Sequence, residues 1–178
     1  MTTAQLEKQT PEDIRLDRAI DEAEGYLELG MPHHALAGLQ RRGSLVHGSS
    51  RACYLLGETL RELHRFREAV APLRRGAELD PTEIHAWLAL GWCYKRSGQL
   101  HDAIESLEAA MAHQPEEAIL HYNLGCYWSL AGDRSRALDH LAKALHIDGS
   151  YRELIDDETD FDPIRQDPGF RLLTSTIV

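Results

Sequence analysis

Hydrophobic positions recur along this chain in pairs of helix-spaced segments, and the pairs repeat every 34 residues. In residues 84–117, two such segments are separated by Ser97-Gly98-Gln99 and are followed by Pro115. A Leu-Gly dipeptide marks the interval, at residues 56–57, 90–91 and 124–125. A fixed period of this length predicts a solenoid of helical hairpins, because each hairpin buries its apolar faces only against its neighbours.

The period predicts one domain over residues 14–151, preceded by a flexible N-terminus of residues 1–13 in which Thr10-Pro11 marks a helix start. The first repeat is degenerate, with Ala23 where the others have glycine, and we interpret it as the N-terminal cap. In the second repeat, Pro72 predicts a bend or a loosened turn. The four repeats cover residues 16–49, 50–83, 84–117 and 118–151.

The third repeat resembles the tetratricopeptide-repeat (TPR) family at nine positions: Trp87, Leu90, Gly91, Tyr94, Gly98, Ala103, Leu107, Ala110 and Pro115. At Leu107 the family more often has an aromatic residue. The resemblance implies an all-α fold, a right-handed superhelical solenoid of four antiparallel helical hairpins with a C-terminal capping helix. It also implies binding to other proteins, since the family serves mostly as a scaffold.

Residues 152–178 leave the repeat pattern and form an acidic linker followed by an apolar segment. The phrase FDPIRQDPGFRLL resembles the closing segment found after the last repeat of many bacterial TPR arrays. Two interpretations stay open at this point. The segment is either a cap that covers the exposed face of the fourth repeat, or a tail that enters the concave groove and competes with a ligand.

Composition narrows the classes of function. The formal net charge of −10 disfavours nucleic acid as the main partner, although residues 41–75 carry eight arginines against three glutamates. We expect no membrane insertion, because no apolar run approaches the roughly 18 residues needed to span a bilayer. There is no secretory signal, and three cysteines without a CxxC pair favour a reducing, cytoplasmic compartment.

Catalytic and metal-binding motifs do not emerge from the sequence. The ten histidines lack zinc-site spacing, and no GxSxG, P-loop or GxGxxG motif is present. We therefore expect no enzyme, no metal and no cofactor.

Candidate ligand contacts follow from the hairpin geometry, in which the first helix of each hairpin lines the concave surface of the resembled family. Its exposed stripe has the spacing i, i+3, i+7, i+10. Trp92 is the preferred anchor, since the family pattern already places its aromatic at Trp87. The predicted groove residues are Tyr54, Glu58, Arg61, His85, Leu88, Trp92, Lys95, Arg96, Tyr122, Asn123 and Cys126.

The leading hypothesis is a non-enzymatic, bacterial adaptor that binds a peptide or helix of a partner protein in this groove. A TPR-type secretion chaperone that shields an apolar client segment is the first alternative. The second is a structural subunit that associates weakly with itself, through its convex face or terminal helices.

Overall fold

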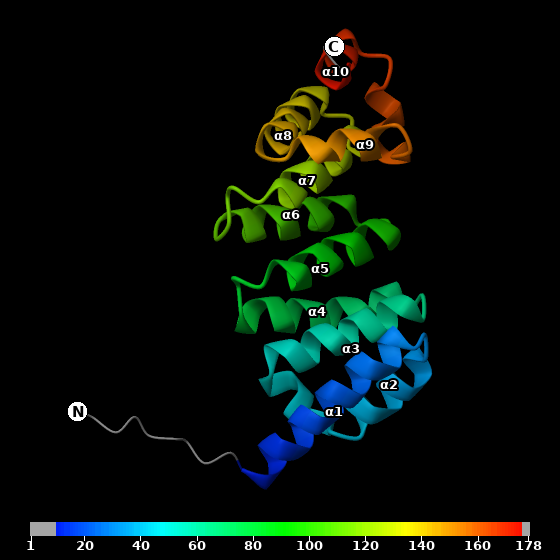
Figure 1. Cartoon of the computed structure of the whole chain (residues 1–178), viewed down its shortest axis with the longest axis vertical. Helices are drawn as coiled ribbons and strands as arrows, with labels where there is room; N and C mark the ends of the chain where they lie inside the picture. Colours follow the sequence, from blue (N-terminus) through cyan, green and yellow to red (C-terminus); the bar gives the residue numbers. More distant parts are fainter. Residues whose placement is uncertain (1–9, 176–178) are drawn as a thin grey trace, which may run out of the picture. The chain divides into compact units, whose positions relative to one another are not determined.

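The computed structural model describes residues 10–175 of the 178-residue chain, and the regular elements in this range are helices (Figure 1). The predicted all-α fold of stacked helix pairs is therefore confirmed. Residue contacts divide the chain into two compact units, residues 1–80 and 81–178, which are described separately below. Within residues 10–175 we find no helix with the length and apolar character needed to cross a bilayer.

The first unit contains two helical hairpins joined by a short 3-10 helix. Helix α1 (Pro11–Glu28) packs on α2 (Pro32–Gln40), and α3 (Ser50–Glu62) packs on α4 (Phe66–Leu79). The connecting helix η1 (Gly43–Gly48) contacts α3, which also packs against α1 and α2. Small and branched residues from these elements form the core, including Ile20, Ala23, Leu39, Val46 and Leu55.

Local signals at Thr10 explain where α1 begins. The Thr10 hydroxyl accepts a hydrogen bond from the Asp13 backbone N–H at 3.1 Å, and the Asp13 carboxylate accepts one from the Thr10 backbone N–H at 2.8 Å. This capping box and Pro11 confirm the predicted helix start. The helix therefore includes residues 11–13, which the sequence pattern assigns to the flexible N-terminus. Residues 1–9 lie outside the described part of the chain.

The second unit contains the two remaining hairpins and the C-terminal segment. Helix α5 (Ile84–Arg96) packs on α6 (Leu100–Met111), and α7 (Ala118–Leu130) packs on α8 (Arg134–Ile147), with α6 also contacting α7. The C-terminal segment then forms short helices: η2 (Gly149–Tyr151), α9 (Arg152–Ile155), η3 (Thr159–Ile164) and α10 (Pro168–Thr174).

The turn inside each hairpin has the same backbone conformation at an interval of 34 residues. Gly30, Gly98 and Gly132 have positive φ angles of 66°, 79° and 80°, and the equivalent residue of the second hairpin is His64, with φ 57°. Glycine is favoured here because a left-handed conformation brings a Cβ atom close to the following carbonyl oxygen. In the second hairpin, α4 continues through the buried Pro72, so this proline does not end the helix.

Candidate protein-binding site

The predicted groove residues of the first unit are held by contacts within that unit. The ring of Tyr54 is half-buried and packs against the core. Arg61 donates to both oxygens of Glu58, at 2.9 and 2.8 Å, and also to Glu62 at 2.9 Å. The charges of Arg61 and its glutamates therefore largely neutralise one another on the surface of α3.

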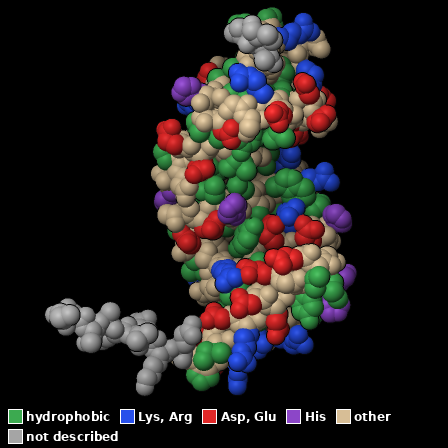
Figure 2. Space-filling model, in the orientation of Figure 1, with side chains coloured by type: hydrophobic (Ala, Val, Ile, Leu, Met, Phe, Trp, Pro, Cys, Tyr) green, Lys and Arg blue, Asp and Glu red, His purple; other side chains and the backbone are tan. Residues whose placement is uncertain are grey.

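In the second unit, α5 presents an aromatic and basic surface. Leu88 and Trp92 are half-buried, whereas His85 and Arg96 are exposed. The Arg96 guanidinium lies 5.6 Å from the centroid of the Trp92 ring, a distance suited to a cation–π interaction. Figure 2 shows hydrophobic and basic side chains exposed side by side near the C-terminal end of α5. This surface offers an apolar contact and positive charge to a ligand.

On α7, the predicted contacts are less accessible than those on α5. The Asn123 amide donates to the Ile119 carbonyl of its own helix at 2.8 Å, so one of its donors is already used. Tyr122 and Cys126 lie one helical turn apart and are both buried, with 6% and 2% of their surface exposed. Their burial comes from outside the repeats, because η3 of the C-terminal segment packs on α7.

We call Tyr122, Cys126 and Tyr127 of α7, together with Lys95 of α5, the α7 patch. The C-terminal segment contributes Phe161, whose fully buried ring meets the Tyr122 ring edge to face at a centroid distance of 5.6 Å. These aromatic rings form the apolar part of the contact.

Charged groups border this apolar contact. The Lys95 ammonium forms an ion pair with the Asp160 carboxylate, and both side chains are largely buried, at 21% and 14% exposure. The same ammonium lies 5.4 Å from the centroid of the Tyr127 ring. The ion pair and the rings together fix residues 158–161 on the α7 patch.

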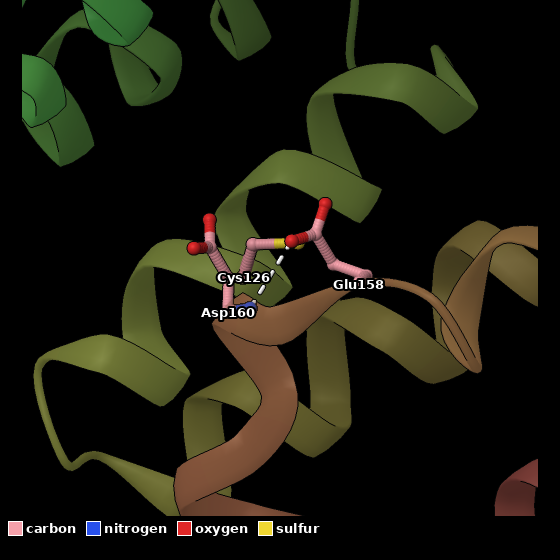
Figure 3. A group of neighbouring side chains, drawn as sticks. All are labelled: Cys126, Glu158 and Asp160. Atoms are coloured by element: carbon pink, nitrogen blue, oxygen red, sulfur yellow. Dashed lines mark hydrogen bonds between the residues drawn. The ribbon is translucent and has the colours of Figure 1, made fainter.

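Cys126 from α7 points toward Glu158 and Asp160 of the C-terminal segment (Figure 3), and their ligand atoms lie within 4.8 Å of one another. Glu158 also accepts a hydrogen bond from the Asp160 backbone N–H at 3.1 Å. This donor set resembles a metal site, but the Lys95 ammonium already supplies positive charge at Asp160. We therefore interpret the group as an ion-pair site.

The electrostatics of the α7 patch keep its side chains protonated. Burial, and after it the nearby charges of Glu158 and Asp160, raises the pKa of the Cys126 thiol well above its usual value. Burial likewise raises the pKa of the Tyr122 phenol. A protonated thiol is a poor nucleophile, so the patch is suited to packing rather than to covalent chemistry. Outside the patch, acidic side chains gather over α9 and η3 (Figure 2).

Sequence reasoning missed two contacts of the second unit. The first is the ion pair of Lys95 with Asp160, which joins residues 65 positions apart. The second is a pair of histidines, His121 of α7 and His140 of α8, whose Nδ1 atoms lie 3.0 Å apart. A signal for the histidine pair existed, since His121 replaces the first aromatic of the repeat pattern and therefore faces the second helix of its hairpin.

The repeat geometry and the inner-face contacts together define a class of protein. Residues 60–125 match the family described as tetratricopeptide repeat, and helical hairpins with the same period continue on both sides of the match. The chain is a TPR protein.

Two solved structures resemble it. The structure of MamA is 23% identical, with a TM-score of 0.71, and the match covers 78% of this chain and 81% of that one. The structure of YrrB, described as a TPR protein with an unusual peptide-binding site, is 24% identical, with a TM-score of 0.69 and coverage of 78% and 72%. At these identities the likeness concerns the fold alone.

Among curated proteins, anaphase-promoting complex subunit 3 of Dictyostelium discoideum is 29% identical over 106 residues. The match covers 59% of this chain and 11% of that protein, so the chain spans about a tenth of the relative's length.

Proposed function

We propose that this protein is a non-enzymatic adaptor that binds a peptide or helix of a partner protein on the inner faces of its first helices. TPR proteins mediate protein–protein interactions, which is the coarse function that the family supplies. The observation that carries the finer proposal is the contact between the α7 patch and residues 158–161. There an inner face holds a peptide segment through an aromatic anchor and an ion pair, the means by which a partner's peptide is held.

On α5, Trp92 is the proposed anchor for the partner. A half-buried ring loses little conformational entropy on binding, and aromatic anchors dominate the energetics of protein interfaces. Leu88 extends the apolar contact, while Arg96 and Lys95 orient acidic groups of the ligand and accelerate association. His85 and Asn123 of the second unit, and Tyr54, Glu58 and Arg61 of the first, are the remaining proposed contacts.

We propose no cofactor and no catalytic step. The thiols of Cys53, Cys93 and Cys126 are buried and unpaired with one another, as expected of a protein in the reducing cytoplasm. The printed description of YrrB, a TPR protein with a peptide-binding site, supports a peptide ligand by analogy of fold.

Affinity capture with two matched tryptophan variants tests the proposal. Trp92→Ala removes the proposed anchor, whereas Trp128→Ala removes a half-buried ring that contacts Arg136 of α8. We expect wild type and Trp128→Ala to capture the same protein from a lysate of the source organism. The purified partner should then bind Trp92→Ala at least about tenfold more weakly, in line with the loss of an interface anchor. Equal binding by the two variants, with both folded by circular dichroism, would show that α5 is not the binding face.

A further inference from the structure

The α7 patch is occupied by the chain's own C-terminal segment. Three side chains that the repeat pattern assigns to ligand binding, namely Lys95, Tyr122 and Cys126, contact or lie beside residues 158–161. The segment lies outside the 34-residue period, so it covers this patch as an added strip of chain rather than as a fifth hairpin. The occupant therefore records what kind of peptide the patch accepts.

Two features of the occupant match the patch. The Phe161 ring is fully buried between Tyr122 and Phe170, at centroid distances of 5.6 and 5.5 Å. The adjacent Asp160 places its carboxylate on the Lys95 ammonium. The patch thus selects an acidic residue followed directly by an aromatic one, with apolar packing for the ring and charge complementarity for the carboxylate.

The fit of the segment to the patch is incomplete. Within residues 10–175 the buried Tyr122 hydroxyl has no hydrogen-bond partner. Glu158 adds a second carboxylate beside Asp160 and Cys126, yet its carboxylate forms no ion pair in the described part of the chain. Buried polar groups in native proteins are almost always satisfied, and an orphaned one weakens the contact that buries it. A permanent core contact would leave neither group in this state, so the segment is suited to exchange.

We propose that the α7 patch binds an acidic–aromatic peptide of the form Glu/Asp-X-Asp-Phe from a partner protein, and that residues 158–161 occupy it as an internal competitor. This inference rests on the proposed adaptor function, because it places the partner on an inner helix face. The tethered segment competes at a high effective concentration. A partner's apparent affinity is reduced in proportion to the fraction of molecules in which the segment has left the patch.

Thiol accessibility tests whether the segment leaves the patch in the full chain. Cys126 lies beneath the segment, whereas Cys53 and Cys93 are buried in α3 and α5 and serve as internal references. Under native conditions we expect iodoacetamide to modify Cys126 at least about tenfold faster than either reference, because local opening is more frequent than global unfolding. Modification of Cys126 at the same rate as Cys93 would identify a permanent cap and overturn the proposal.

Two aspartates of η3 provide a matched pair of variants. Asp160→Asn breaks the ion pair with Lys95, whereas Asp162→Asn changes an exposed carboxylate two residues away. We expect Asp160→Asn to accelerate Cys126 modification about fivefold or more and Asp162→Asn to leave the rate unchanged. Phe161→Ala should accelerate it as well, while keeping both carboxylates of the patch. Equal rates in Asp160→Asn and Asp162→Asn would contradict the proposed role of the ion pair.

A labelled synthetic peptide of residues 152–170 then tests the ligand chemistry in trans. We expect it to bind full-length Asp160→Asn at least about tenfold more tightly than wild type, because the internal competitor is weakened. Binding should be lost when the peptide carries Phe161→Ala or when the chain carries Lys95→Glu. A folded Asp160→Asn chain that binds no peptide would overturn the proposal. A concentration-dependent dimer that the peptide dissolves would assign the patch to a second copy's segment instead, which also contradicts a partner peptide.

The outcomes separate this inference from the proposed function. If the peptide binds as expected and Trp92→Ala leaves partner capture unchanged, the α5 face is wrong and the α7 patch stands. If Trp92→Ala abolishes partner binding while Cys126 stays as protected as Cys93, the adaptor function stands and the internal competitor is wrong.

Discussion

The Nδ1 atoms of His121 in α7 and His140 in α8 lie 3.0 Å apart, so the two rings share a hydrogen bond. The Nε2 atom of His121 lies 2.9 Å from the Pro115 carbonyl oxygen, which only accepts hydrogen bonds, so Nε2 of His121 carries a proton. Nδ1 of His121 is then the acceptor and Nδ1–H of His140 is the donor. This arrangement requires a neutral His121 ring, because a second proton on it would remove the acceptor.

Stability should fall as the pH drops through the range in which His140 resists protonation. Burial, and after it the neighbouring His121, lowers the pKa of His140 from 6.5 to about 4, with Lys143 and Arg136 acting in the same direction and Asp139 opposing them. The unfolded chain therefore binds more protons between these two values, and stability rises with pH across this window. Allowing for solvent screening, we expect a loss of roughly 1–2 kcal/mol in unfolding free energy between pH 7 and pH 5.

Urea unfolding of His140→Asn at pH 7, 6 and 5 checks this expectation. The asparagine amide keeps a donor near the position of Nδ1 but does not titrate, so the pH slope should shrink by about the amount above. His101→Asn is the control, because His101 is exposed on α6 and its side chain meets only Glu105, one turn away, among the ion pairs formed in residues 10–175. An unchanged slope in His140→Asn would show that the histidine pair is not responsible.

The hairpins of this protein could be predicted from its sequence because the signals are local and repeated. Each Leu-Gly dipeptide lies at the same position of a first helix, and Gly30, Gly98 and Gly132 each mark a turn. The second turn was harder to recognise, because His64 takes the left-handed position without being a glycine. Its distance of 34 residues from Gly30 and from Gly98 identifies it nonetheless.

The candidate site could be predicted only in part, since its cover comes from outside the period. Helical spacing places Tyr122 and Cys126 on one face of α7, as the structure has them. Residues 152–175 leave the repeat pattern, so no periodicity indicates which helix face they contact. The ion pair of Lys95 with Asp160 depends on that tertiary contact, and charge alone does not distinguish Asp160 from its acidic neighbours.

Replacing His64 by glycine should stabilise the protein. A left-handed backbone at a residue with a side chain costs roughly 1–2 kcal/mol, and glycine avoids this cost. Part of the gain is offset because the His64 ring contacts the Phe66 ring edge to face at 5.8 Å. We expect His64→Gly to raise the free energy of unfolding by about 0.5–1 kcal/mol in urea titrations. The reverse test is Gly98→Ala, which should lower it by about 1 kcal/mol; a loss in both variants would mean that the ring contact dominates at His64.

Two glycines in helix interiors should respond to alanine in opposite directions. A Cβ atom at Gly57 of α3 would lie 2.3 Å from Cγ of Leu73 in α4, a fully buried side chain with little room to move. A Cβ atom at Gly25 of α1 would meet no atom within 4 Å. We therefore expect Gly57→Ala to destabilise the protein by about 1–3 kcal/mol through overpacking, and Gly25→Ala to be neutral or stabilising by up to about 1 kcal/mol through helix propensity.

A second substitution at the contact separates overpacking from other causes. If the added methyl group of Gly57→Ala collides with Leu73, then shortening that side chain should relieve the collision. Leu73→Val alone should be destabilising, since it leaves a cavity in the core. In the Gly57→Ala background the same change should cost less, giving a favourable coupling of about 0.5–2 kcal/mol in a double-mutant cycle. Additive effects of the two substitutions would contradict close packing of α3 on α4 as the reason for glycine at position 57.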